Sequence, residues 1–535
     1  MGLTYNLADL FEQVAAVASE RTAIVTPARR LSYGQLDERA TRLANHLAAA
    51  GVGAGDHISL FMQNGTPYLE AMLAAFKLRA VPININYRYV ERELAYLFEN
   101  SDSVAVIYDA QYGPRVDAVR GQCPRLRHFV AVADDSGAAP IDGSIDYEEA
   151  LAAAATTSPA VPDRSGADLY IAYTGGTTGM PKGVMWRHDD IFFAALGGGD
   201  PTQFEGPITA PDQLTGRIPE VGGIQLITPP LMHVSAHWGA LQALLGGGTV
   251  VLLSPGRFDP DEALATVAAE GVMILILVGD AMARPLTDAI EAADGGHDLS
   301  SMFVVASGGA MLSASVKDAL RDQLPDIVVV DGYGSSETGV AGSQTTMGAS
   351  AGGGPSFAMS ADTTVLDDNM APVEAGSGVI GLLARQGHVP LGYYKDSEKS
   401  AATFVELDGV RWVLPGDLAT PEADGTITLL GRGSVSINTG GEKVFPEEVE
   451  SCLKAHPGVY DAVVVGIDDD KWGQRVVAVV SVRSGTELHL SDLQTHCRSE
   501  LAGYKIPREL VVVDEIQRNP NGKADYAWAK EVAVG

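Results

Sequence analysis

The sequence predicts an α/β protein with a large N-terminal domain of βαβ-type subdomains, a small β-barrel-like piece and a small α+β C-terminal domain. Three observations support this fold class. The 535 residues are too many for one hydrophobic core. Apolar runs alternate with helical patterns as far as residue 331, which is typical of parallel βαβ units. Short strand-like runs between Gly, Asp and Pro then follow, and a mixed pattern returns toward the end of the chain.

The first part of the chain alternates between helices and strands. Asn6 can cap a helix that has Leu7, Leu10 and Val14 on one face, and a second helix ends at Gly51. A hairpin over residues 22–33 separates these two helices. Further along we expect strand 57–62, helix 68–79, strand 81–85, helix 91–99 and strand 104–108.

Two segments without clear periodicity interrupt this pattern. Residues 134–164 are rich in Ala, Asp, Pro and Ser, which indicates a surface connection. Residues 197–223 are rich in Gly and Pro, and their length fits a functional lid and a disordered excursion equally well. Around them the alternation continues with strand 169–172, an apolar segment 191–196, strand 224–228, helix 236–245, strand 249–253, helix 260–269, strands 272–278 and 302–306, helix 313–323 and strand 327–331.

Beyond Thr338 the pattern changes. Short runs at 363–366, 379–384 and 426–430 predict a small antiparallel sheet, and the stretch 431–434 resembles a joint between domains. The predicted C-terminal elements are helix 446–454, strands 462–465 and 476–482, helix 491–501, strand 509–513 and a tail that carries Lys523. Residues 376–381 match G-x-G-x-x-G, but no strand precedes them and no helix follows, so we reject a dinucleotide fingerprint there.

Composition and charge exclude several classes of protein. Hydrophobic residues make up 46% of the chain, which indicates a globular protein. The formal net charge of -31, from 37 basic and 68 acidic residues, argues against a nucleic-acid binder or an acidic-membrane binder. The three cysteines lie far apart, so we expect neither disulfides nor zinc. We also expect no signal peptide and no membrane span, and therefore a cytoplasmic protein.

The most informative stretch is the glycine- and threonine-rich run 173–183, which follows an apolar strand. Backbone N–H groups, threonine hydroxyls and the charge of Lys182 together suit phosphate oxygens, so we interpret the run as a phosphate loop. The spacing excludes a Walker loop, because Met180 and Pro181 separate Gly179 from Lys182. A Gly/Thr-rich surface turn is the alternative if the loop is considered alone.

Four further stretches between Pro229 and Lys523 accompany this loop. The run Thr-Gly-Gly-Thr-Thr-Gly-Met-Pro-Lys-Gly-Val that begins at Thr174 closely resembles the signature of the adenylate-forming superfamily. This superfamily contains acyl-CoA synthetases, adenylation domains of peptide synthetases and firefly-type luciferases. Because all five motifs stand in the order of the family, the resemblance covers nearly the whole chain.

The resemblance implies a nucleotide site. Two loops, Ser307-Gly308-Gly309-Ala310 and the stretch that begins Asp331-Gly332-Tyr333-Gly334, would sandwich adenine, with Tyr333 stacked on the base. Ser336, in place of the more frequent Thr, would offer a hydroxyl to the α-phosphate or the acyl oxygen. Glu337 would bind Mg²⁺, with Thr174 as a second ligand. The phosphate contacts are expected from Thr174, Gly175, Gly176, Thr177, Thr178, Gly179 and Lys182.

The resemblance also assigns the ribose and the catalytic lysine. Asp417 would accept hydrogen bonds from the ribose hydroxyls and Arg432 would donate to the same sugar, although Pro415 replaces the usual Thr or Ser. Lys523 lies in Pro-Asn-Gly-Lys and would stabilise the negative charge that develops as the carboxylate attacks phosphorus.

A second step would use the same site after the C-terminal domain rotates. The hinge of the family falls at Ser434, where Asp or Lys is usual. The turn that contains Gly440 and Gly441 would then face the site and leave a passage for pantetheine. His233 would act as a gate at the acyl pocket. Lipophilic residues around that pocket, each of which could equally serve the core, are Val234, Trp238, Met282 and Met311.

These features predict an acid–thiol ligase with domains 1–433 and 434–535. A carboxylate and ATP would give acyl-adenylate and pyrophosphate, and CoA would then give the thioester and AMP, with Mg²⁺ as cofactor. The details resemble a bacterial branch that activates long-chain fatty acids or steroid side-chain acids. The alternatives are an enzyme that loads a carrier protein, a non-catalytic nucleotide-binding relative and, less favoured, a luciferase-like oxidase. The acyl group is not determined, and a homodimer is left open.

Overall fold

The computed structural model describes residues 3–161, 163–175, 180–200, 205–310, 312–346, 356–432, 435–439, 442–469, 471–519 and 522–535, and for Arg432 it describes the backbone alone. One sheet belongs to the N-terminal part of the chain. Its central strands are parallel, as the alternating pattern predicts. The strand order is β19 (Gly392–Tyr393), β9 (Lys182–Arg187), β8 (Leu169–Thr174), β4 (Val81–Asn84), β3 (His57–Phe61), β5 (Ser103–Asp109), β6 (His128–Val132) and β7 (Ile145–Asp146).

A second sheet changes from parallel to antiparallel along its width. The parallel part, preceded by the hairpin strand β2 (Arg30–Ser32), is β1 (Thr22–Val25), β11 (Thr249–Leu252), β10 (Ile224–Ile227), β12 (Ile274–Leu277), β13 (Val304–Gly308) and β14 (Val328–Ser335). The antiparallel part continues with β15 (Gly339–Thr346), β16 (Ser356–Met359), β23 (Thr426–Arg432), β22 (Asp417–Pro421), β18 (Gly381–Arg385), β21 (Val410–Val413) and β20 (Phe404–Leu407), and β17 (Thr363–Leu366) also pairs with β18. The predicted small antiparallel piece is therefore joined edge to edge to the parallel strands.

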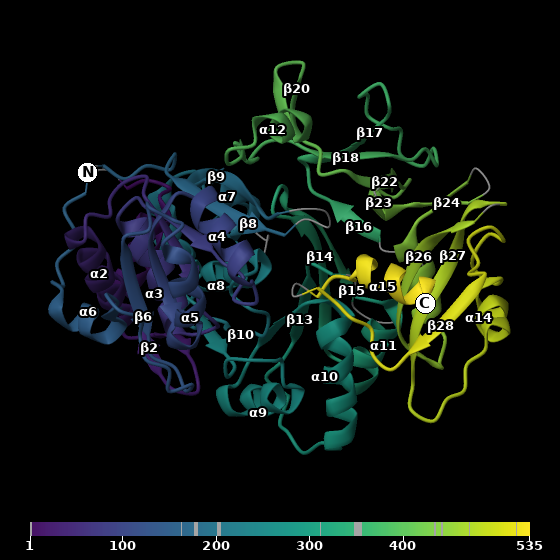
Figure 1. Ribbon diagram of the computed structural model, residues 1–535, viewed down its shortest axis with the longest axis horizontal. Helices are drawn as coiled ribbons and strands as arrows, with labels where there is room; N and C mark the ends of the chain where they lie inside the picture. Colours follow the sequence, from purple (N-terminus) through teal and green to yellow (C-terminus); the bar gives the residue numbers. More distant parts are fainter. Residues whose placement is uncertain are drawn as a thin grey trace.

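Helices cover these sheets and connect their strands (Figure 1). The helix α8 lies between the two sheets, because its side chains share one core with Tyr170 of β8 and Ile227 of β10. The α-helices of this part are α1 (Leu7–Val17), α2 (Tyr33–Ala49), α3 (Thr66–Lys77), α4 (Glu91–Asn100), α5 (Gly113–Arg120), α6 (Tyr147–Ala153), α7 (His188–Ala195), α8 (Val234–Leu245), α9 (Pro260–Glu270), α10 (Gly279–Ala293), α11 (Ala314–Gln323) and α12 (Ser397–Thr403), with 3₁₀ turns η1 (Ala110–Tyr112), η2 (Gly197–Gly199) and η3 (Pro211–Arg217).

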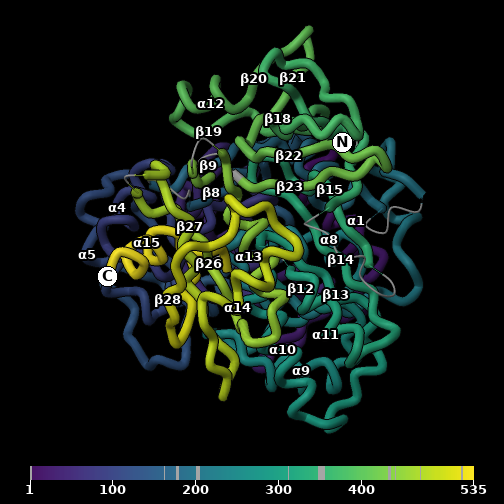
Figure 2. The backbone as a smooth tube through the Cα atoms, turned by 90° about the vertical axis from the view of Figure 1, so that its right-hand side faces the viewer, coloured from purple at the N-terminus to yellow at the C-terminus, as the bar shows by residue number. Residues whose placement is uncertain are grey.

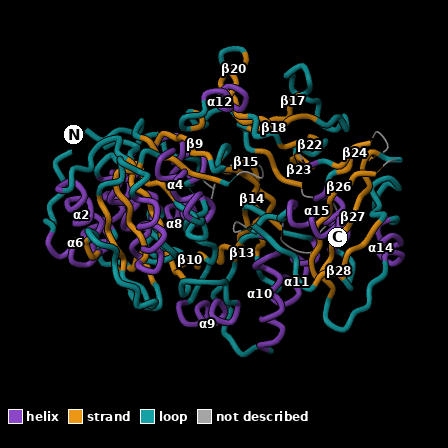
Figure 3. Tube along the Cα trace, viewed as in Figure 1, coloured by secondary structure: helices purple, strands orange, loops and turns teal. Residues whose placement is uncertain are grey.

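The described residues from 435 onward form the C-terminal unit. It contains β24 (Ile437–Thr439), β25 (Glu442–Val444), α13 (Pro446–Lys454), β26 (Val459–Asp469), β27 (Gly473–Val482), α14 (Leu490–Cys497), β28 (Glu509–Val513) and α15 (Tyr526–Val534). Side chains alternate across β26 and β27, so that Val464 packs with α13 and α14 while Val463 packs with α15. Figure 3 shows α14 and α15 on opposite sides of these strands.

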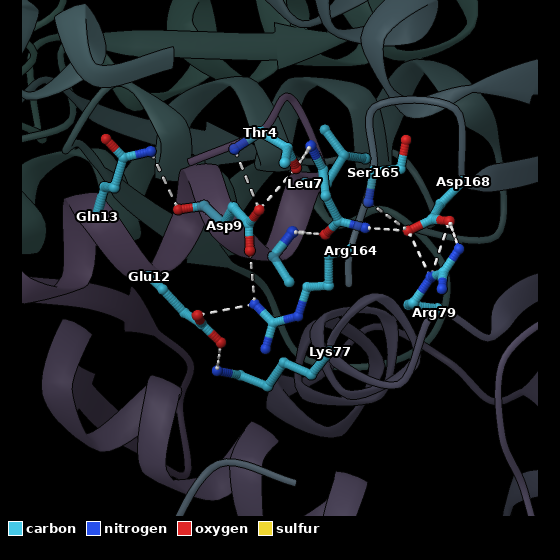
Figure 4. A network of polar contacts seen from close by, with 12 residues as sticks. Thr4, Leu7, Asp9, Glu12, Gln13, Lys77, Arg79, Arg164, Ser165 and Asp168 are labelled. Carbon is cyan, nitrogen blue, oxygen red and sulfur yellow. Dashed lines mark hydrogen bonds and ion pairs between the residues drawn. The ribbon is translucent and has the colours of Figure 1, made fainter. Parts of the chain in front are cut away.

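A polar network near the N-terminus fixes the approach to β8 (Figure 4). Asn6 caps α1 and donates from Nδ2 to Oδ2 of Asp168 at 2.8 Å. Arg79, at the end of α3, donates to both carboxylate oxygens of Asp168. Lys77 is only 1% exposed and pairs with Glu12 at 2.6 Å. These contacts tie α1 and α3 to the segment that leads into β8, and so they set the direction of the strand that carries Thr174.

Several elements lie where the sequence pattern did not predict them. Residues 134–164, expected as a surface connection, contain β7 and α6. The strand β9, the helix α10 and the helix α15 that follows Lys523 were also not predicted. Within the described residues, none of the helices is long and apolar enough to cross a membrane.

Candidate active site

The parallel strand β13 ends at Gly308, beside the middle of β14. Ser307 pairs with Asp331, and Gly308 pairs with Gly332. A Cβ atom on Gly332 would lie 3.4 Å from the Ser307 carbonyl oxygen, and Gly309 has a φ of +88°, which favours glycine. The end of β13 therefore exposes backbone instead of side chains, and Ala310 follows Gly309. In open parallel sheets the carboxyl ends of the strands are where ligands bind.

The second predicted loop is wrong in its secondary structure. Asp331, Gly332, Tyr333 and Gly334 do not follow a strand but form the second half of β14. The strand continues because β15 returns beside it in antiparallel pairing, with Tyr333 opposite Gly342. A Cβ on Gly334 would lie 2.1 Å from the Gly339 carbonyl oxygen, so this close pairing requires glycine. Only residues 336–338 form the turn between the two strands.

The Asp331 carboxylate is held by a lysine of the protein itself. Its Oδ2 lies 2.8 Å from Nζ of Lys317, which also donates to Gln344. Burial raises the pKa of Asp331 to about 6, against the opposite effect of Lys317. The side chain of Asp331 is thus engaged in the core, and a nucleotide would meet its backbone.

The candidate base-stacking residue and the candidate ribose residue are in direct contact. The Tyr333 hydroxyl donates to Oδ2 of Asp417 at 2.5 Å, and the ring of Tyr333 lies 5.8 Å from that of Phe357. Asp417 begins β22 and pairs with Arg432 of β23. The backbones of the two residues expected to bind ribose are therefore opposite each other on adjacent strands, and Asp417 also contacts Tyr333 of β14.

The predicted phosphate loop is the connection of a β-hairpin. Thr174 ends β8 and pairs with Lys182, which begins β9. Trp186 of β9 donates from Nε1 to the Ser336 carbonyl oxygen at 2.9 Å, which fixes the hairpin to the turn that carries Ser336 and Glu337. Of the remaining loop residues, Gly175 is described, whereas Gly176, Thr177, Thr178 and Gly179 lie outside the described residues.

Tyr393 links the predicted magnesium ligand to the predicted phosphate lysine. Its hydroxyl donates to Oε1 of Glu337 at 2.9 Å, and Nζ of Lys182 lies 5.5 Å from its ring centroid. Lys182 also donates to Asp396 at 2.6 Å. Sequence reasoning missed Tyr393 and Asp396, since no motif marks them, and they join the site only because β19 pairs with β9.

The turn that carries Lys523 reaches the same region. A Cβ on Gly522 would lie 2.7 Å from Cγ1 of Val278, and one on Gly309 would lie 4.0 Å from the same atom. The Gly309 position is also 3.8 Å from Oγ of Ser235, at the start of α8. His233 is the residue that precedes α8. The structure thus brings the lysine turn and the end of β13 beside the start of α8, which follows the predicted gate residue, and Lys523 itself is exposed.

Both ring nitrogens of the neighbouring His237 have partners within the protein. His237 is buried, contacts the Leu231 carbonyl oxygen at 2.8 Å and the Tyr170 hydroxyl, and burial lowers its pKa to about 4. Across the described residues no three His, Cys, Asp or Glu side chains are grouped to hold a metal. Gly440, Gly441, Met311 and Ser434 lie outside the described residues, as does the side chain of Arg432.

Comparison with known protein families gives two matches. The AMP-binding enzyme family matches residues 11–394, and the AMP-binding enzyme C-terminal domain matches residues 448–523. The chain belongs to the AMP-binding enzyme family. The recognition made from the five motifs is therefore confirmed, and so is the predicted α/β fold class.

Curated relatives of this family member are similar over nearly their whole length. A protein of Rhodococcus rhodochrous named 3-oxocholest-4-en-26-oate–CoA ligase is 46% identical over 539 residues, covering 99% of this chain and 96% of the relative. A Mycolicibacterium smegmatis protein named medium/long-chain-fatty-acid–CoA/3-oxocholest-4-en-26-oate–CoA ligase is 45% identical and covers 99% of this chain and 97% of itself.

Solved structures show the same fold. The anthranilate–CoA ligase AuaEII in complex with anthranoyl-AMP has a TM-score of 0.86 at 24% identity, over 100% of this chain and 98% of its own. ATP-bound MatB from Rhodopseudomonas palustris has a TM-score of 0.82 at 25% identity, over 99% of both chains.

The site of this AMP-binding enzyme fits Mg²⁺. Glu337 is a half-buried carboxylate, and one of its oxygens accepts from Tyr393. Carboxylate, phosphate and water oxygens are the ligands that Mg²⁺ prefers. The ligand roles of Glu337 and Thr174, like the roles of the other predicted site residues, stay predictions.

We expect Tyr393→Phe to raise the Mg²⁺ concentration needed for half-maximal pyrophosphate release by about tenfold, because a hydrogen bond that orients a ligand typically contributes 10- to 100-fold. The ring that faces Lys182 is retained in this variant. Tyr394→Phe is the matched control, since its hydroxyl donates to Asp102 instead. Equal effects of the two substitutions would contradict this prediction.

Glu447 lies where the C-terminal unit contacts the second sheet. A Cβ on Gly431, where φ is +84°, would lie 2.3 Å from Oε2 of Glu447. Burial, followed by the nearby charges of Glu450 and Asp417, raises the pKa of Glu447 to about 8. The carboxyl group is therefore protonated in the folded protein at neutral pH.

A raised pKa makes this contact sensitive to pH. At Glu447 the folded protein binds more protons than the unfolded chain between about pH 4.5 and 8. The contribution of this group to the free energy of unfolding therefore falls as pH rises through this window. Glu447→Gln mimics the protonated form. We expect the melting temperature of the wild type, relative to that of Glu447→Gln, to fall between pH 5 and pH 8. A constant difference over this range would show that Glu447 ionises normally.

Proposed function

We propose that this chain is an AMP-forming acyl-CoA ligase for lipophilic carboxylic acids, either medium- or long-chain fatty acids or steroid side-chain acids. The names of relatives that are 44–46% identical over nearly the whole chain support this substrate class. The observation that carries the proposal is the contact of Tyr333 on β14 with Asp417, together with the turn that bears Lys523 lying against Val278, which also neighbours Gly309 after the adjacent strand β13. The substrates are ATP, CoA and the acid, and Mg²⁺ is the cofactor.

The first step joins the acid to the nucleotide. A carboxylate oxygen forms a bond to the α-phosphorus of ATP, and the bond from that phosphorus to the pyrophosphate oxygen breaks. Lys523 and the Ser336 hydroxyl bind oxygens on which negative charge increases, and Asp417 and Arg432 hold the ribose. Glu337 and Thr174 would hold Mg²⁺, which when bound would neutralise charge on pyrophosphate.

The acid would bind along α8. His233 precedes this helix, and Trp238 is fixed because its Nε1 donates to the Tyr170 hydroxyl at 3.0 Å. Met282 lies near Thr228 on the neighbouring strand end. An apolar wall of this kind favours alkyl or ring substrates over charged ones.

In the second step the turn that carries Lys523 leaves the site and the thiol of CoA enters it. In our proposal the domain of residues 434–535 rotates about Ser434 relative to residues 1–433, and the turn with Gly440 and Gly441 then faces the acyl-adenylate. The thiol of CoA attacks the acyl carbon, the thiol proton is released, and AMP leaves. The two family matches, which lie on either side of residue 434, support this division.

We expect Lys523→Ala to abolish adenylate formation and to leave thioester formation from supplied acyl-adenylate largely intact, because only the first step uses this ammonium group. The two half reactions are measured separately, by acid-dependent pyrophosphate release and by CoA consumption. An equal loss in both half reactions would contradict a mechanism in which the C-terminal domain rotates between them.

A panel of carboxylic acids of increasing bulk tests the proposed function itself. AMP production with CoA should be highest for long-chain fatty acids or steroid side-chain acids. Adenylate formation that free CoA does not consume would instead indicate an enzyme that loads a carrier protein. The absence of pyrophosphate release with every acid would indicate a nucleotide-binding relative without catalysis.

Compartment and oligomeric state complete the proposal. We place the protein in the cytoplasm, which the free thiols of Cys123, Cys452 and Cys497 support, and we propose that it forms a homodimer. Light scattering in solution measures the oligomeric state directly.

A further inference from the structure

The C-terminal unit, at the yellow end of the colour scale, packs against the rest of the protein (Figure 2). Buried charges cross this contact. Lys454 ends α13, and its side chain is only 4% exposed. Its Nζ lies 3.5 Å from Oδ2 of Asp280 on α10 and 3.4 Å from Oδ1 of Asp461 on β26. Lys454 therefore joins one carboxylate of its own unit to one carboxylate of the N-terminal part.

Asp280 is held in place on its own side of this contact. Its side chain is 3% exposed, and Oδ1 accepts from the backbone N–H of Ser313 at 2.8 Å. Among the described residues Oδ2 accepts no hydrogen bond, and it faces Lys454 at 3.5 Å and Arg284 at 3.7 Å. A buried carboxylate in this position depends on these two cations.

Asp461 extends the chain of charges to the catalytic turn. Arg518 donates to both oxygens of Asp461, at 2.7 Å and 2.8 Å from Nη2. The same arginine donates from Nη1 to the Gly522 carbonyl oxygen at 3.1 Å. The backbone N–H of Asn519 donates to the Lys523 carbonyl oxygen. The position of Lys523 is thus coupled, through Arg518 and Asp461, to Lys454.

The two ends of this chain of charges both lie against one short segment of the N-terminal part, residues 278–280. Asp280 is two residues after Val278, the residue that Gly522 contacts. Rotation of the C-terminal unit would separate Lys454 from Asp280, whereas the pair of Arg518 with Asp461 lies within the unit and would move with it. The ion pair between Lys454 and Asp280 is therefore specific to the arrangement described here.

We propose that Lys454 and Asp280 are positioning residues for Lys523, forming a buried ion pair that holds the C-terminal unit in the arrangement in which adenylate forms. This inference rests on the proposed ligase function. It assigns the pair to the first half reaction alone, since the second uses the rotated arrangement. Neither residue lies in the motifs that carry the family resemblance.

The test compares the two half reactions in Lys454→Met, which keeps the apolar stem and removes the charge. We expect acid-dependent pyrophosphate release to fall by about 10- to 100-fold, because a misplacement on the order of 1 Å can cost a hundredfold in rate. Thioester formation from supplied acyl-adenylate should be unchanged or faster. Asp280→Asn, which still accepts from Ser313, should also lower pyrophosphate release without lowering thioester formation. The loss of pyrophosphate release in the double variant should be no larger than in either single variant.

Arg257→Met is the matched control, because Arg257 also pairs across the contact, with Glu515 at 3.1 Å, but is 88% exposed. This variant should leave both half reactions unchanged. Lys454→Arg, which keeps the charge, should recover part of the lost rate. Equal losses in both half reactions, or no loss in either, would overturn the proposal.

Small-angle X-ray scattering gives a readout that does not need activity. The wild type and Arg257→Met should share one scattering profile, and Lys454→Met should differ from them while melting at a similar temperature. If the wild type released no pyrophosphate, the proposed function would fail, and scattering alone would test whether the ion pair holds the C-terminal unit in place. Identical profiles for the wild type and Lys454→Met would show that it does not.

Discussion

The site depends on the parallel pairing of β13 with β14. Their register places Ser307 beside Asp331 and Gly308 beside Gly332, so the end of β13 lies beside the middle of β14. The return of β15 then positions the turn with Ser336 and Glu337. The close approach of the Gly339 carbonyl oxygen requires glycine at Gly334, and this glycine lets β15 return directly beside β14.

The acidic net charge of the chain limits how it can bind anions. A protein with a net charge of -31 has to bind anionic substrates through local cations and N–H groups. Near the predicted phosphate loop, Lys182 contacts Asp396 and the ring of Tyr393. Ion pairs of this kind hold a cation ready in a defined place while the bulk of the surface remains acidic.

The sequence predicted the fold class and the family because five motifs and the alternation of strands and helices are local properties. It did not predict that β14 extends to Ser335, since this depends on pairing with β15. Tyr393 was also missed, because a tyrosine far along the chain reaches Glu337 only when β19 pairs with β9. The ion pair of Lys454 with Asp280 depends on how two parts of the chain pack, and no local pattern in either segment marks it. The roles of the motif residues remain predictions that rest on the family.

The helix α15 gives the lysine segment a second anchor. Asp525 caps this helix by accepting from the N–H groups of Ala527 and Trp528, and Ala529 and Ala533 are buried against the sheet. Arg518 holds the other end of the segment, and an isolated β-bridge joins Arg518 to Ala524. Both flanks of Lys523 are thus fastened within one unit, and in the proposed role of this lysine that anchoring would lower the entropy lost when its ammonium group meets the substrate. A truncation that removed the last helix would release one end of this support.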